Sequence, residues 1–82
     1  MITKSEIYQA VSYLLESAKN RDTSQGVLVY TKFLDMIDAA QDDKAVRELL
    51  VRLNRSLAGI EAHGDFTDEE FKRVLFLRKG EG

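Results

Sequence analysis

Carboxylates are the side chains of this sequence that could do chemistry, and they gather in two stretches. Residues 33–43 contain four aspartates, residues 61–71 contain five acids, and neither stretch contains lysine or arginine. Paired carboxylates can act in general acid–base catalysis or bind divalent cations. Residues 65–70 superficially resemble a calcium loop, but they lack its alternating ligand positions and its central glycine. Three acids instead follow Thr67, where the first turn of a helix favours negative charge.

Other groups that support catalysis are scarce. His63 is the single histidine, and no nucleophile or set of co-ligands accompanies it. We therefore interpret it as a residue whose charge is favoured at a helix C-terminus. Cysteine is absent, which excludes disulfides and thiolate zinc sites, and neither GxGxxG nor GxxxxGK[ST] occurs. The sequence predicts a protein that is not an enzyme and that needs no cofactor or metal.

The composition is typical of one small soluble domain. Because the 82 residues include no cysteine, the chain must fold on apolar burial, and 44% of its residues are hydrophobic. A net charge of −2 argues against a general nucleic-acid binder. No apolar run approaches the roughly 18 residues that cross a bilayer, and the first residues lack the pattern of a secretory signal. We expect a single cytoplasmic domain over residues 1–82.

Apolar spacing predicts four helices, at about residues 3–19, 24–40, 43–63 and 67–79. The connections between them are short, which favours an all-α fold, a compact antiparallel four-helix bundle. The third helix is the element around which the others should pack, because its apolar residues recur at steps of four, three, four and three. These residues are Val46, Leu50, Leu53, Leu57 and Ile60.

Two of the predicted helices start with the same capping chemistry. Thr3 with Glu6, and Thr67 with Glu70, have the spacing of a capping box, in which each side chain bonds the backbone amide of the other residue. The last helix is short and rich in charge. Its residues expected in the core are Phe71, Val74, Leu75 and Leu77.

The second helix is harder to assign. Val27–Thr31 alone has strand propensity, but the apolar pattern continues at helical spacing to Ala40, and a lone strand would have no partner. We therefore predict a helix. Its apolar arc covers about half the circumference, which is broader than the roughly 100° stripe of a surface helix. Either this helix packs between two others or part of it meets a second chain, with Tyr30, Phe33 and Met36 as the candidate oligomer interface.

The junction of the third and fourth helices resembles a known pattern. Residues 57–71 read LAGIEAHGDFTDEEF, and this order of helix, glycine turn and hydrophobic-Thr-x-x-Glu-Phe is similar to the short C-terminal (SHOCT) domain, over residues 54–77. The resemblance implies a helical hairpin that mediates oligomerisation or other binding. The sequence departs from the family after Phe71, where KRVLF at residues 72–76 replaces the usual lysine-rich, leucine-ended tail.

The leading hypothesis is a protein that acts by binding another protein, with a homodimer as one form. Its most concrete version is an immunity or antitoxin-like inhibitor that presents an acidic surface to a basic protein. The candidate partner-binding residues are Asp35, Asp38, Asp42, Asp43, Glu69 and Glu70. One alternative is nucleic-acid binding through Arg47, Arg52 and Arg55, which the acids at the start of the fourth helix disfavour. Others are a regulatory oligomerisation module and a subunit whose site a partner chain completes.

Overall fold

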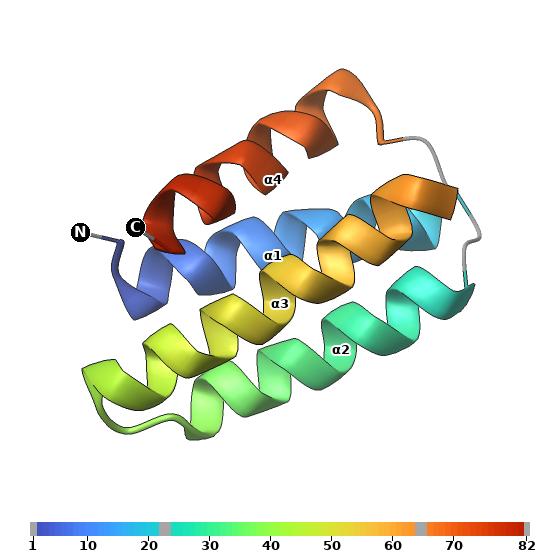
Figure 1. Ribbon diagram of the computed structural model, residues 1–82. Coiled ribbons are helices and arrows are strands. Elements are labelled where there is room, and N and C mark those ends of the chain that lie inside the picture. Colours follow the sequence, from blue (N-terminus) through green and yellow to red (C-terminus); the bar gives the residue numbers. More distant parts are fainter. Residues whose placement is uncertain (1, 22–23, 64–65, 82) are drawn as a thin grey trace.

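The computed structural model describes residues 2–21, 24–63 and 66–81, which contain four helices and no strand. The helices are α1 (Lys4–Asn20), α2 (Ser24–Ala39), α3 (Asp43–His63) and α4 (Asp68–Glu81). Successive helices run in opposite directions (Figure 1). The predicted all-α bundle is therefore confirmed, and so is the helical assignment of residues 27–31. The glycine turn expected at Gly64 lies outside the described residues.

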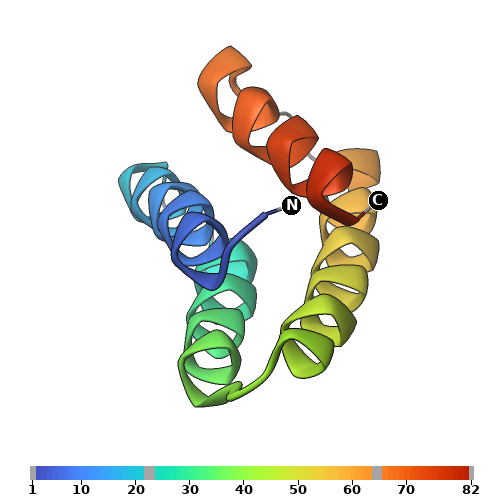
Figure 2. The same cartoon turned by 90° about the vertical axis from the view of Figure 1, so that its left-hand side faces the viewer.

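The helices form two antiparallel hairpins that face each other. Figure 2 shows α1 beside α2 and α3 beside α4, and contacts also join α1 to α4 and α2 to α3. The bundle measures 33 × 22 × 18 Å. Because the chain runs up and down twice, its first and last described turns meet at the same end of the bundle. No described helix is both long and apolar enough to span a membrane.

The core is built on the predicted row of α3. Leu50 and Leu53 are 1% exposed and Leu57 is 0% exposed. They are spaced at three and four residues, so one stripe of the helix is buried along its length. Residues from the other three helices cover this stripe. The largest of them with essentially no exposed surface are Ile7, Val11, Leu14, Ile37, Val74 and Leu77.

Side-chain caps start three of the helices. The Glu6 amide donates to Thr3 Oγ1 at 3.1 Å and the Thr3 amide donates to Glu6 Oε1 at 3.0 Å, which confirms the first capping box. The second capping box is confirmed as well. The Glu70 amide donates to Thr67 Oγ1 at 3.2 Å, and the Thr67 amide donates to Glu70 Oε1 at 2.8 Å. Asp42 caps α3 by accepting from the amide three residues onward at 2.7 Å.

α4 turns only part of its predicted face inward. Val74 and Leu77 are fully buried, but Phe71 and Leu75 are 37% and 39% exposed, so their predicted burial is wrong. Glu70 lies one turn before Val74 and is only 3% exposed. Its carboxylate is satisfied by the α4 cap and by Arg21, so this polar residue, rather than Phe71, occupies the inward position.

Gly80 allows the start of the chain to pack on the end of α4. A Cβ atom built at this position would lie 2.7 Å from both Cγ2 and Cδ1 of Ile2, and 2.9 Å from its Cβ. Non-bonded carbon atoms are normally about 3.5–4.0 Å apart. The close approach of Ile2 to the α4 backbone therefore requires glycine.

We predict that Gly80→Ala lowers the free energy of unfolding by about 1 kcal/mol, because overpacking outweighs the gain in helix propensity. Chemical denaturation monitored by circular dichroism measures this change. In an Ile2→Ala background the same substitution should cost nothing or be slightly stabilising. An equal cost in both backgrounds would contradict the packing argument.

Candidate functional site

The two acidic stretches do not form one surface. Asp35 and Asp38 lie in the last two turns of α2, and Asp42 and Asp43 lie at the start of α3. The acids at residues 68–70 lie at the start of α4, which is at the opposite end of the bundle from the α2–α3 connection (Figure 1). The 21 residues of α3 separate the two ends, which corresponds to about 30 Å. Each stretch must therefore be considered as a separate candidate site.

At the α2–α3 turn all four aspartates are exposed. None of them belongs to an ion pair within the described part of the chain. A cation does contact the backbone of this stretch, since Lys4 Nζ donates to the carbonyl oxygens of Asp38 at 3.2 Å and Ala40 at 2.8 Å. That contact ties the start of α1 to the end of α2. The four carboxylates are exposed, and that of Asp42 also caps α3, so these aspartates form an acidic surface beside the Lys4 ammonium.

The second stretch is largely used by the fold. Glu69 is exposed and pairs with Lys72 at 3.1 Å. Glu70 is buried, so its prediction as a partner-binding residue is wrong. Its carboxylate accepts from Arg21 Nη1 at 2.5 Å and from the Thr67 amide at 2.8 Å. A carboxylate held this way links α1 to the start of α4 and cannot meet a partner.

The surroundings of Glu70 favour its charged form. Burial by itself would raise the pKa of this carboxyl group. The Thr67 amide, the Ser17 hydroxyl, the Arg21 guanidinium and the Thr67 hydroxyl together hold its pKa below the usual value. Glu70 is therefore an ionised group inside the bundle, and its partners are all part of the protein's own framework.

The candidate oligomer residues of α2 are mostly inside the protein. Tyr30 is 2% exposed and Phe33 is 7% exposed, whereas Met36 is half-buried. Of the two predicted explanations for the wide apolar arc of α2, packing between other helices accounts for Tyr30 and Phe33. Burial, with a smaller contribution from the nearby Glu70 carboxylate, raises the pKa of Tyr30 to about 12.

Asn54 is a second polar residue whose burial the sequence analysis does not predict. Asn54 is 8% exposed, and its Nδ2 donates to the Leu77 carbonyl at 3.2 Å and to Glu81 Oε2 at 2.9 Å. It joins α3 to α4, while its Oδ1 has no hydrogen-bond partner in the described residues. The sequence signal was the position of Asn54 directly after Leu53 in the apolar row. A polar residue next to the apolar row of α3 can be exposed at the edge of the row or buried within it, and the spacing of the sequence does not distinguish these two positions.

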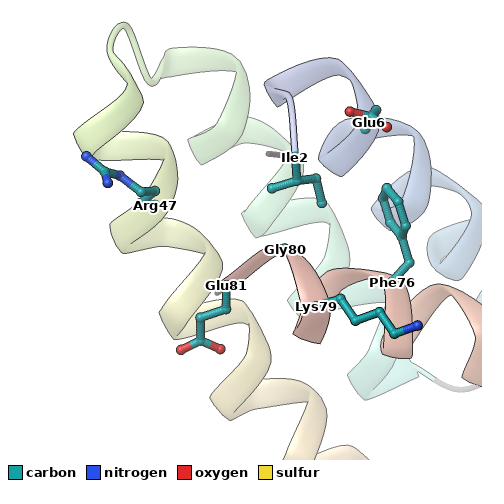
Figure 3. A pocket seen from close by; sticks show the side chains of 7 residues that line it. All are labelled: Ile2, Glu6, Arg47, Phe76, Lys79, Gly80 and Glu81. Atoms are coloured by element: carbon teal, nitrogen blue, oxygen red, sulfur yellow. The ribbon is translucent and has the colours of Figure 1, made fainter.

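A shallow hollow of about 580 Å³ opens where the chain ends meet α3. Figure 3 shows Arg47 and Lys79 pointing away from each other, so these cations do not converge on a ligand. Its two acids, Glu6 and Glu81, are already bonded to Thr3 and Asn54. The full lining is Ile2, Glu6, Arg47, Phe76, Lys79, Gly80 and Glu81. No group of three or more His, Cys, Asp or Glu residues suited to a metal ion occurs in the described residues.

No protein-family model, curated protein or solved structure matches this chain. The resemblance of residues 57–71 to the SHOCT domain therefore stays a prediction. α3 and α4 do pack against each other as a hairpin.

We predict that Glu70→Gln lowers the free energy of unfolding by about 1–2 kcal/mol at pH 7, because hydrogen bonds to a buried charged group are lost. The pKa of Glu70 is lower in the folded than in the unfolded protein. The stability that the ionised Glu70 contributes is therefore present above its pKa in the unfolded chain, about 4.3, and is lost as the pH falls through its lower pKa in the folded protein. Urea denaturation at several pH values should show that the difference in free energy of unfolding between the wild type and Glu70→Gln becomes smaller at acidic pH. A gap that does not depend on pH would contradict this assignment.

Tyr30 should ionise late and destabilise the fold when it does. Its pKa rises from the ordinary value of 10.0 to about 12 on folding. The free energy of unfolding should therefore be unaffected below pH 10 and should decline between pH 10 and 12. An absorbance titration of tyrosinate should show a step near pH 12 that Tyr30→Phe removes. Exposed Tyr8→Phe is the matched control and should leave that step in place.

Proposed function

We propose that this protein is a small non-catalytic helical protein that acts by binding another protein. Its most concrete role is that of a neutralising partner of the immunity or antitoxin type, which covers a basic surface of its target. The observation that supports this proposal is the exposed acidic surface of Asp35, Asp38, Asp42 and Asp43, which has no ion-pair partner among the described residues. Glu70 is not part of this surface because it is buried.

The geometry of this surface suits a basic partner. Asp35 and Asp38 are three residues apart on α2, so they occupy neighbouring positions on one side of the helix. Asp42 and Asp43 extend the negative charge across the turn to α3. Like charges grouped in this way attract a cationic protein over about 8 Å at physiological salt and raise its association rate.

The polar groups inside the bundle support a role without catalysis. Glu70 and Asn54 are the buried polar residues among those described, and both bond to neighbouring helices. Neither lines the hollow at the chain ends. We place the protein in the cytoplasm, because a chain without cysteine suits a reducing compartment.

The proposal is tested by reversing the charge of the acidic surface. The immobilised protein is used to capture its partner from a lysate of the source organism, and the partner is identified by mass spectrometry and purified. Association is then followed by stopped-flow fluorescence at low and high salt. We expect Asp35→Lys with Asp38→Lys to slow association about tenfold and to weaken its dependence on salt.

The matched control changes the net charge equally at a distance from the surface. Glu16→Lys with Asp68→Lys also replaces two exposed acids, on α1 and at the start of α4. It should leave the association rate within about twofold of the wild-type rate. If the control slows association as much as the Asp35 and Asp38 reversal does, only net charge matters and the proposed surface is wrong.

A further inference from the structure

A second hollow, of about 330 Å³, lies between α2 and α3. Its apolar lining is accessible, since Met36, Ala45 and Leu49 are half-buried and Ala39 is exposed. Met36 belongs to the apolar arc of α2, and Ala45 and Leu49 face it from α3. The residues that line this α2–α3 groove are Met36, Ala39, Ala40, Ala45, Glu48, Leu49 and Arg52.

The charged residues of the groove are balanced. Glu48 and Arg52 are four residues apart on α3, one turn of the helix, and both are exposed. Neither forms an ion pair with another residue in the described ranges. A strongly acidic or strongly basic partner would be attracted to one of these residues and repelled by the other. A partner with one charge of each sign at the same spacing is therefore complementary to the groove.

The chain itself presents a surface of this kind. In a two-fold symmetric contact the same patch is used twice, so every pair of residues occurs twice with the roles exchanged. If the α3 helices of two copies pack antiparallel across the two-fold axis, Glu48 of each copy faces Arg52 of the other. Ala39 and Ala45 are small enough to let the helices approach closely. We infer that the α2–α3 groove binds the same groove of a second copy, which forms a two-fold symmetric dimer.

This inference relocates the predicted oligomer interface. Tyr30 and Phe33 are used by the protein's own core, and Met36 is the candidate residue that stays accessible. The inference is independent of the proposed function, because neither Asp35 nor Asp38 lines the groove. If the dimer test fails, the acidic-surface proposal is unaffected. If the charge reversal of Asp35 and Asp38 has no effect, the dimer inference is unaffected.

The experiment uses single charge reversals, alone and mixed. Glu48→Arg gives two positive charges per groove and Arg52→Glu gives two negative charges, so neither variant can pair with itself. Sedimentation equilibrium should show the 9.3 kDa wild-type chain associating to twice that mass. Each variant alone should dimerise at least about tenfold more weakly. An equimolar mixture should recover the wild-type mass, because each variant then supplies the charge that the other lacks.

Control variants separate this contact from a general charge effect. Arg47→Glu reverses another exposed residue of α3, which lies off the stripe of Ala45, Glu48, Leu49 and Arg52 that lines the groove, and it should dimerise like the wild type. Circular dichroism should show that every variant is as helical as the wild type. A wild-type protein that stays monomeric up to about 1 mM would overturn the inference. So would single reversals without effect, or a mixture that associates no better than its components.

Discussion

The leucine row of α3 requires cover from the other helices, and this requirement organises the bundle. Leu50, Leu53 and Leu57 have almost no exposed surface, and a fully buried leucine contributes about 1.5–3 kcal/mol. An 82-residue chain without disulfides has few such residues to use. Each remaining helix therefore presents its own apolar row to α3 or to its neighbours. The surface features described above are formed by the residues that do not take part in covering this row.

α4 shows how polar groups assist where apolar burial is small. Val74 and Leu77 are the fully buried apolar residues of α4. Two such residues contribute only a few kcal/mol to its packing, at about 1.5–3 kcal/mol each. Glu70 and Asn54 add hydrogen bonds to α1 and α3 at opposite ends of α4. The Arg73 guanidinium also lies 4.5 Å from the ring centroid of Tyr13 on α1. Buried polar bonds of this kind specify one orientation of a helix, because other rotations would leave charged groups without partners.

The two proposed surfaces differ in chemistry. The aspartates at the α2–α3 turn carry one sign of charge and suit a partner of the opposite sign. The α2–α3 groove has an apolar floor and one charge of each sign, which suits a copy of itself. α2 supplies residues to both surfaces, which explains why its sequence combines a wide apolar arc with exposed aspartates. The polar residues that are buried, in contrast, serve the fold.

The sequence by itself determined the four helices, their starts at Thr3 and Thr67, and the buried row of α3. These features depend on local chemistry: spacing at three and four residues defines a helical face, and a cap is completed within four residues. Only the tertiary structure decided that Glu70 is buried, that Phe71 is exposed, and that the two acidic stretches lie at opposite ends. Those outcomes depend on contacts between residues far apart in the chain. Arg21 and Glu70 are 49 residues apart, and no local pattern shows that they meet.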